Sequence, residues 1–367
     1  MFYACSSDST IPEELQPYSR FEGIQESMPI AQRVNLIPED FLNSTNFVDS
    51  LQLAQHERGF DVVSIADGAH LFYLRDSDQL YTINREGNAS LIASSGNDPH
   101  SIQEGICLRV MDENVYVVQR ARISKVVCDP ECALNVLNIY DHGDSGFINS
   151  IYPISSGDFV VNGYDRNGKH TLHIVNEDFE ILESKGEYFQ HSNPALVANY
   201  NLAYLSANRS GDFFAHVYGS FPFIALYNVS LDLKRVYRVH DFFDHWIATG
   251  LDPFATGYEK NHMVPASTLV TVNPLGESAF WVIVAHQRHI NRQAGFGPVE
   301  IAHFFDFYIL EEEQGLSYVG SLHDYAVPQG ESLYVLKDQM VYRVDVSLEQ
   351  LPEFQHEVFD LPEGFDE

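Results

Sequence analysis

Two distant stretches of the chain repeat one pattern: LFYLRDSDQLYTIN at residues 71–84 and LYVLKDQMVYRVD at residues 333–345. Each begins with four apolar residues, continues through a basic residue and an aspartate, and ends in a second run centred on tyrosine. Aromatic and branched residues on both sides of a short polar turn are typical of a β-hairpin. The recurrence therefore predicts an internal repeat of short antiparallel strands.

Looser copies of this pattern lie between the two stretches and set the number of repeats. They begin near four positions: Val115, Phe159, Phe213 and Phe280. With the two aligned stretches they make six units. Leu71 and Leu333 lie about 260 residues apart, which five steps of about 52 residues fill, and a four-stranded propeller blade takes about 40–50 residues.

The repeat predicts the fold class and the organisation of the chain. Helical patterns are nearly absent after residue 60, which disfavours alternating α/β folds. We predict an all-β fold, a six-bladed β-propeller with four-stranded antiparallel blades, over residues 46–367. Residues 1–45, which prolines punctuate, are expected to form an N-terminal tether and irregular segment that packs along the propeller. Residues 46–56 are expected to add a strand to the last blade and close the ring.

The first predicted blade carries a resemblance to a known family. Residues 51–120 run as strand, hairpin, the loop NREGNASLIASSGNDPHSIQEG and a new strand. This rhythm resembles that of the six-bladed β-propeller lipoproteins, NHL-like or TolB-like, of Bacteroidetes and similar bacteria. The resemblance implies a propeller over roughly residues 50–350. It implies no activity, because most members have no established one and fold alone does not specify function.

The acidic composition excludes several classes of partner. The chain carries 52 Asp and Glu against 21 Lys and Arg, a formal net charge of −31. Nucleic acid needs a basic face, so nucleic-acid binding is excluded, as is docking on anionic lipid through a charged surface. Hydrophobic residues make up 45% of the chain, which indicates a folded protein. We expect a monomer that contacts a membrane only through a lipid anchor.

The cysteines predict an exported protein. FYAC at residues 2–5 resembles the end of a bacterial lipoprotein signal, so Cys5 is a candidate for lipidation. A chance cysteine in a terminal tail is the alternative. Cys128 and Cys132 form a CxxxC around a proline turn, and a short-loop disulfide is the simplest expectation for an exported chain, with two free thiols as the alternative. The predicted location is the periplasm or the cell surface.

Histidines recur in the loops that cross from one predicted blade to the next. Such loops gather on one face around the channel, where ligands usually bind. The loop between blades 4 and 5 is long and mixes aromatic with titratable groups, as binding loops do. The candidate ligand-binding residues are His100, His142, His191, His240, Asp241, His245, Trp246 and His323. The alternative is that they are ordinary polar loop residues.

Two functions remain open from the sequence. The first is a lipid-anchored binding or scaffold propeller that recognises an envelope protein, a peptide or a glycan on its loop face. The second is a metal-assisted hydrolase or lyase at the channel mouth, with a divalent metal on His142, His191 and His245. No P-loop or dinucleotide fingerprint implies another cofactor. A local basic island at residues 286–292 is a further place that could receive a carboxylate or phosphate.

Overall fold

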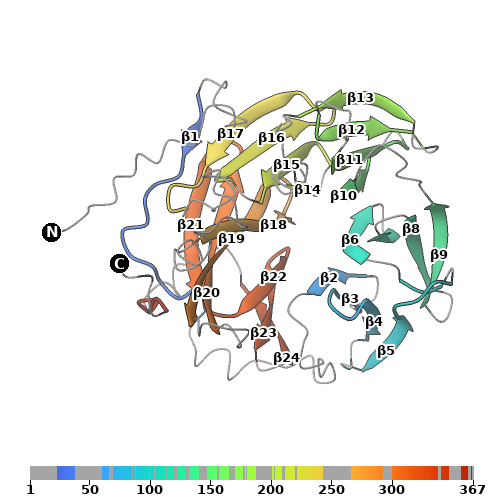
Figure 1. Ribbon diagram of the computed structural model, residues 1–367, viewed down its shortest axis with the longest axis horizontal. Helices are drawn as coiled ribbons and strands as arrows, with labels where there is room; N and C mark the ends of the chain where they lie inside the picture. The colour runs from blue at the N-terminus through green and yellow to red at the C-terminus, as the bar shows by residue number, and fades with distance from the viewer. Residues whose placement is uncertain are drawn as a thin grey trace.

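The protein is a ring of six β-sheets around a central axis (Figure 1). The computed structural model describes residues 23–37, 60–65, 69–84, 86, 88–98, 100–102, 105–111, 114–119, 122–128, 132–139, 147–154, 157–164, 170–176, 178, 180–186, 201, 203–208, 211–219, 221–242, 266–291, 300–337, 340–346, 357–362 and 365. Each sheet consists of consecutive strands, with one N-terminal strand added to the fourth sheet, and this arrangement confirms the predicted six-bladed β-propeller. Within these ranges no helix has the length and apolar character needed to cross a bilayer.

The blades follow one another along the chain. Blade 1 contains β2 (Phe60–Ser64), β3 (His70–Leu74), β4 (Gln79–Ile83) and β5 (Ala89–Ala93). Blade 2 contains β6 (Gly105–Met111), β7 (Asn114–Gln119), β8 (Arg122–Cys128) and β9 (Cys132–Ile139). Blade 3 contains β10 (Phe147–Pro153), β11 (Phe159–Tyr164), β12 (Leu172–Val175) and β13 (Ile181–Lys185).

The second half of the ring continues in the same way. Blade 4 contains β14 (Ala203–Ala207), β15 (Phe213–Tyr218), β16 (Phe223–Asn228) and β17 (Leu233–Arg238). Blade 5 contains β18 (Ala266–Leu275), β19 (Ala279–Asn291), β20 (Glu300–Glu311) and β21 (Gly315–Leu322). Blade 6 contains β22 (Tyr325–Gln329), β23 (Ser332–Lys337) and β24 (Met340–Asp345). Residues 46–56, predicted to add a closing strand here, lie outside the described residues.

The core consists of six apolar layers, one between each pair of neighbouring blades. Because both faces of a blade are covered, central strands such as β15 and β16 are apolar almost throughout. The layer between blades 6 and 1 joins Phe60 and Phe72 to Tyr334, with the last two ring centroids 5.6 Å apart. The inner strands β2, β6, β10, β14, β18 and β22 lie side by side in this order. Packing thus closes the ring.

An N-terminal segment, residues 23–37, runs along the outside of blades 4 and 5 (Figure 1), and we call it the strap. Its strand β1 (Gln25–Glu26) pairs in parallel with β17 and gives blade 4 a fifth strand. Further along, Asn35 bridges Ser321 of β21 and Val34 bridges Val358 of the C-terminal segment. The strap therefore covers two edge strands that would otherwise be open to pairing.

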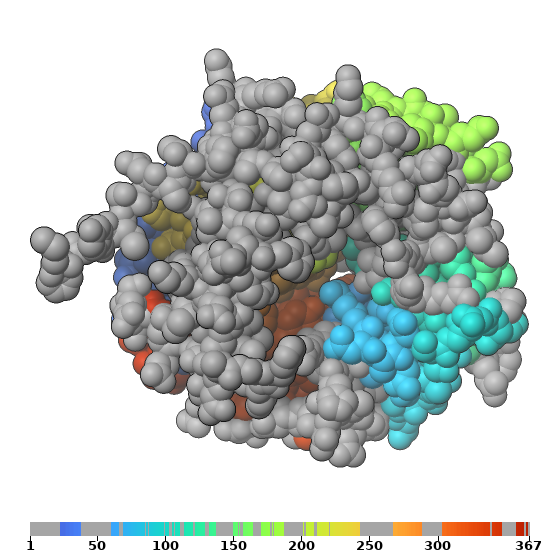
Figure 2. Space-filling model, viewed as in Figure 1, coloured from blue at the N-terminus to red at the C-terminus, as the bar shows by residue number. Residues whose placement is uncertain are grey.

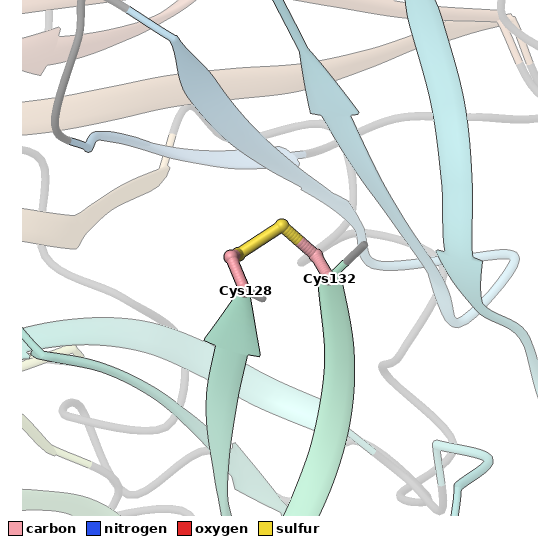
Figure 3. Close-up of a disulfide and its surroundings, with 2 residues drawn as sticks. All are labelled: Cys128 and Cys132. Atoms are coloured by element: carbon pink, nitrogen blue, oxygen red, sulfur yellow. A yellow bond between two sulfur atoms is a disulfide. The ribbon is translucent and has the colours of Figure 1, made fainter. Parts of the chain in front are cut away.

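A disulfide closes the hairpin between β8 and β9 (Figure 3). Cys128 and Cys132 lie opposite each other in the ladder, and their sulfur atoms are 2.03 Å apart. The third cysteine in the described ranges, Cys107, is a buried thiol on β6. The bond ties together the two outermost strands of blade 2.

His216 is a buried histidine between blades 3 and 4. Its Nε2 accepts a hydrogen bond from Asn162 Nδ2 at 2.8 Å, and burial lowers its pKa to about 3. In the unfolded chain the imidazole of this histidine titrates near pH 6.5. Below that pH the unfolded state therefore binds a proton at this residue that the folded state does not bind. Acidification from pH 7 to pH 5 should therefore lower the free energy of unfolding by about 2 kcal/mol through this residue.

Urea unfolding of the wild type and of His216→Gln at both pH values isolates this effect. The stability of the variant relative to the wild type should improve by about 2 kcal/mol between pH 7 and pH 5. His170→Gln, at an exposed histidine, is the control and should show no such change. If the difference in stability between His216→Gln and the wild type is the same at the two pH values, the imidazole is not held neutral by burial.

Candidate functional site

Two of the predicted ligand residues contact peripheral elements. The Nδ1 atom of His100 lies 3.1 Å from Leu134 O on β9, the outermost strand of blade 2. The ring of His323 stacks on Phe359 of the C-terminal segment, with centroids 4.3 Å apart. A crossing loop starts at the outer strand of a blade, so its first residues can lie far from the axis. The structure does not bring His100 and His323 together.

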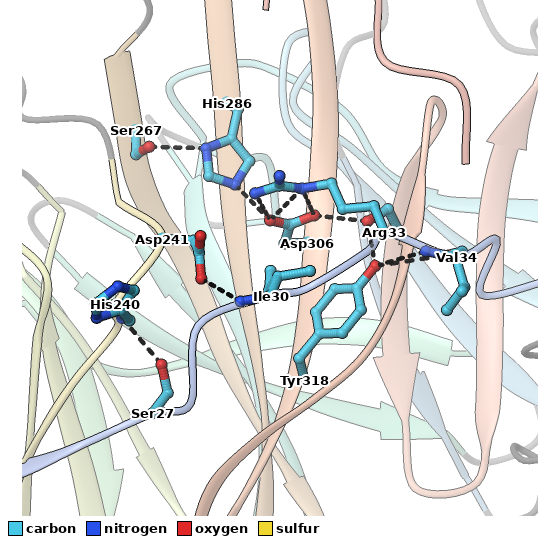
Figure 4. Close-up of polar contacts among 11 residues, drawn as sticks. Ser27, Ile30, Arg33, Val34, His240, Asp241, Ser267, His286, Asp306 and Tyr318 are labelled. Atoms are coloured by element: carbon cyan, nitrogen blue, oxygen red, sulfur yellow. Dashed lines mark hydrogen bonds and ion pairs between the residues drawn. The ribbon is translucent and has the colours of Figure 1, made fainter. Parts of the chain in front are cut away.

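Two others hold the strap against blade 4 (Figure 4). The backbone N–H of His240 donates to Ser27 Oγ at 2.9 Å. The backbone N–H of Ile30 donates to Asp241 Oδ2 at 2.7 Å. These contacts fix the path of the strap where it leaves β17, so both residues have a structural task.

The other predicted functional residues lie outside the described residues: Cys5, His142, His191, His245 and Trp246. The metal site suggested for His142, His191 and His245 therefore stays a prediction. Among the residues that the structure does describe, no three histidine, cysteine, aspartate or glutamate side chains are grouped so that they could hold a metal ion.

A row of buried polar side chains crosses blade 5 and ends on the strap (Figure 4). Asp306 of β20 accepts hydrogen bonds from Arg33 Nη2 (2.8 Å), His286 Nε2 (3.0 Å) and Ser321 Oγ (2.6 Å). Burial raises the pKa of Asp306, but His286 and Arg33 lower it more, so the pKa lies below its ordinary value. The carboxylate is ionised, and Arg33 brings its counter-charge from the strap.

Three members of this row have the connectivity of a Ser–His–Asp triad. Ser267 Oγ lies 2.7 Å from His286 Nδ1, and His286 Nε2 faces Asp306. All three side chains are fully buried, whereas a nucleophile must be reached by its substrate. We assign the row a structural role, since it joins all four strands of blade 5 to the strap. His286, predicted to belong to a local basic island that could receive a carboxylate, is buried against a carboxylate of its own chain.

A second group of charges lies at the axis of the ring. Asp61 stands on β2, the inner strand of blade 1, and Arg75 Nη2 donates to its Oδ1 at 2.5 Å. Asp61 Oδ2 also accepts a hydrogen bond from Leu108 N on the inner strand of blade 2, at 3.2 Å. Arg75 interacts electrostatically with Tyr204 of blade 4 and Tyr325 of blade 6, yet 34% of its side chain is exposed. A side chain between these blades that still meets solvent lies in the wall of the channel.

Arg109 spans the channel from blade 2 to blade 4. Its Nη1 donates to Leu108 O at 2.8 Å, and its Nη2 lies 3.4 Å from Leu205 O on β14. On the way the guanidinium passes over the ring of Tyr152 on β10, 5.1 Å from the centroid. Burial lowers the pKa of Arg109, but electrostatic interactions with neighbouring groups outweigh it, so the pKa is raised and the group is charged.

Both guanidiniums have donors to spare. The Nε atoms of Arg75 and Arg109 are buried and have no partner within the described part of the chain. An arginine carries five N–H donors, of which Arg75 uses one and Arg109 two in these ranges. Buried donors without partners cost free energy, and charged donors bind anions strongly. The spare donors therefore mark a place where an anion would be stabilised.

Two tyrosines complete what we call the axial site: Asp61, Arg75, Arg109, Tyr204 and Tyr325. Burial raises the pKa of Tyr204 and of Tyr325, and the opposing effect of Arg75 is smaller, so both phenols stay neutral. Figure 2 shows the visible face of the molecule hollowed near its centre, beside the blue atoms of blade 1. The guanidiniums of the axial site can bind an anionic group, and the phenols can donate to further oxygens of a ligand.

No residue of the axial site is among the candidate ligand-binding residues predicted from the sequence. Its charged members stand in or next to apolar strands, FDVVS, HLFYL and GICLRVM, which the sequence favours as core. A charged residue inside an innermost strand is the signal that could have found Asp61 and Arg109, because in a propeller these strands line the channel. Arg75 follows β3, the second strand of blade 1, and carries no such signal. Histidine recurrence selects loops by residue type and does not show where a side chain points.

Comparisons with known proteins find distant similarity to solved structures. No protein-family model and no curated protein sequence matches the chain. Virginiamycin B lyase from Staphylococcus aureus is 11% identical, with a TM-score of 0.45 over 81% of this chain and 98% of its own. A member of the DUF4221 family from Bacteroides vulgatus is 9% identical, with a TM-score of 0.49 over 85% of this chain and 96% of its own.

Regucalcin from Agrobacterium tumefaciens, a calcium-binding protein, is 11% identical to this chain. Its TM-score is 0.45, over 88% of this chain and 96% of its own. These similarities assign the protein to no family. Any function must therefore be argued from the residues of the chain itself.

Proposed function

We propose that the protein is a binding propeller that holds a small anionic molecule at the axial site. The observation that carries the proposal is the pair Arg75 and Arg109, which together face one carboxylate and each keep a buried Nε without a described partner. Buried charge is costly and does not stabilise a fold by itself. In a chain with a formal net charge of −31, two arginines in the channel are best explained by a ligand that they bind.

The proposal moves the ligand from the loop face to the channel. The side chain of Asp241 binds the strap, whereas His240 contacts the strap through its backbone N–H, so the loop face loses Asp241 as a free candidate side chain. An envelope protein, peptide or glycan stays compatible if it presents an acidic group to the channel. The metal-assisted alternative stays a prediction, because His142, His191 and His245 lie outside the described residues.

Export and lipidation at Cys5 remain part of the proposal. The Cys128–Cys132 disulfide supports export, because disulfides persist in oxidising compartments such as the periplasm. Mass spectrometry of protein recovered from the cell envelope, with and without reductant, would test both features.

Arg109→Met tests the proposed function, because methionine fills part of the same volume but has neither charge nor donors. Isothermal titration calorimetry with benzoate and with glucuronate measures the affinity. We expect the wild type to bind at least one of these acids. We expect Arg109→Met to bind it at least tenfold more weakly, since a hydrogen bond to a charged group contributes about 1.5–3 kcal/mol.

Arg343→Met is the matched control for this experiment. Arg343 lies on β24, with 42% of its side chain exposed, and pairs with Asp345 at 3.0 Å. Its replacement should leave the affinity unchanged. The proposal is wrong if the wild type binds neither acid, or if Arg109→Met binds as tightly as the wild type. Urea unfolding of both variants verifies that they are folded.

A further inference from the structure

We infer that the ligand of the axial site is a monoanion that binds through a carboxylate, an inference that rests on the proposed function. The axial site contains two guanidiniums and one carboxylate, so one positive charge is left for the ligand. Asp61 neutralises Arg75 through an ion pair of 2.5 Å. Arg109 has only carbonyl oxygens as described hydrogen-bond partners. The charge of Arg109 is therefore the one that a ligand would neutralise.

A further carboxylate of blade 1 is occupied elsewhere. Asp78 accepts hydrogen bonds from Tyr73 Oη at 2.5 Å and from Gly105 N at 3.0 Å. These partners are a neutral phenol and a backbone amide, and neither guanidinium of the axial site bonds to Asp78. The positive charge of Arg109 thus keeps no described counter-ion.

The charge balance disfavours a ligand with two negative charges. A second charge would meet no second uncompensated cation, and it would face the carboxylate of Asp61. Like charges a few ångströms apart repel strongly where water is partly excluded. The field of a chain with a net charge of −31 adds to this repulsion. Inorganic phosphate and dicarboxylates should therefore bind less well than a monocarboxylate.

The geometry of Arg109 favours a carboxylate over other monoanions. A planar guanidinium binds a planar carboxylate through two parallel N–H···O bonds. Among the described residues, the Nε of Arg109 has no partner, and Nη2 has only the long contact of 3.4 Å to Leu205 O. The Nε–Nη2 edge therefore offers the two donors that the two oxygens of a carboxylate need. Tyr152 lies against the face of the guanidinium and fixes its plane.

Asp61→Asn tests the inference through a gain of binding, which misfolding cannot imitate. The variant keeps the size of the side chain and an acceptor for Leu108 N, but it releases the charge of Arg75. We would titrate both proteins at neutral pH with benzoate, phthalate and benzamide, which carry one, two and no negative charges. The wild type should bind benzoate at least tenfold more tightly than either analogue. In Asp61→Asn, the affinity for phthalate should rise about tenfold or more, while the affinity for benzamide should stay unchanged.

The outcomes separate this inference from the proposed function. If the wild type binds neither glucuronate nor any of the three probes, the proposed function and this inference are both wrong. If benzamide binds as well as benzoate, or phthalate binds best to the wild type, the channel binds ligands but the monoanion inference is overturned. If phthalate gains nothing in Asp61→Asn, the inference is overturned as well. Asp345→Asn, an exposed carboxylate paired with Arg343, is the control and should keep the wild-type order. If Asp61→Asn does not fold, the affinities of the wild type for the three probes still test the monoanion inference.

Discussion

Arg33→Met is expected to lower the free energy of unfolding by about 3–5 kcal/mol, because it leaves a buried carboxylate without its counter-charge. Asp306 has no exposed surface and the side chain of Arg33 is only 14% exposed, so the pair is largely removed from water. The guanidinium reaches both carboxylate oxygens, with Nε 3.1 Å from Oδ1 and Nη2 2.8 Å from Oδ2. Urea unfolding at pH 7 measures the loss.

Arg238→Met is the matched control, because Arg238 also binds the strap through an ion pair. Its Nη1 lies 3.0 Å from Glu26 Oε1, but 48% and 50% of the two side chains are exposed. Exposed pairs are screened by water and contribute at most about 1 kcal/mol. Equal losses in Arg33→Met and Arg238→Met would show that the buried carboxylate does not depend on the strap, contrary to our expectation.

A double variant separates the pair from its surroundings. The double variant Arg33→Met with Asp306→Asn has no unpaired buried charge. Its free energy of unfolding should therefore fall by less than the sum of the decreases in the two single variants. Asp306 also accepts bonds from His286 and Ser321, which an asparagine satisfies only in part. Some loss should therefore remain in the double variant.

The propeller could be predicted from the sequence because each blade is local. Consecutive strands form one sheet, so the pattern of residues 71–84 returns at a regular interval and gives the number of blades. The strap could not be predicted in this detail. Its strand β1 pairs with β17, which is distant in the sequence, and that pairing depends on an edge that exists only in the folded ring.

The candidate site was harder to predict because side-chain direction decides it. His240 has the residue type of a ligand, yet its backbone binds the strap. Arg109 stands in an apolar strand, yet it crosses the channel. Direction follows from register, and a shift of one residue turns a side chain to the other face. Such a shift occurs in β6 between Gly105 and Cys107, just before Arg109, and no local pattern announces it.

Gly320→Ala is expected to lower the free energy of unfolding by about 2–4 kcal/mol, because β21 has no room for a Cβ atom beneath the strap. Gly320 has a φ of +154°, and a Cβ there would lie 2.7 Å from Leu36 Cα and 3.0 Å from Leu36 N. Both are backbone atoms, so the strap itself must move. That movement would strain the bonds from Leu36 N to Ser321 O (2.9 Å) and from Ser321 N to Val34 O (2.8 Å).

Gly330→Ala separates this clash from the cost of the backbone conformation. Gly330 also has a positive φ, +58°, but a Cβ there would meet nothing within 4 Å, so it should cost only about 1 kcal/mol. Hydrogen exchange should show that the amides of Leu36 and Ser321 lose protection in Gly320→Ala and keep it in Gly330→Ala. Equal losses of stability would contradict the close approach of strap and blade. The excess loss in Gly320→Ala measures the contact between the strap and blade 5 together with the higher cost that a φ of +154° has for a residue with a Cβ atom.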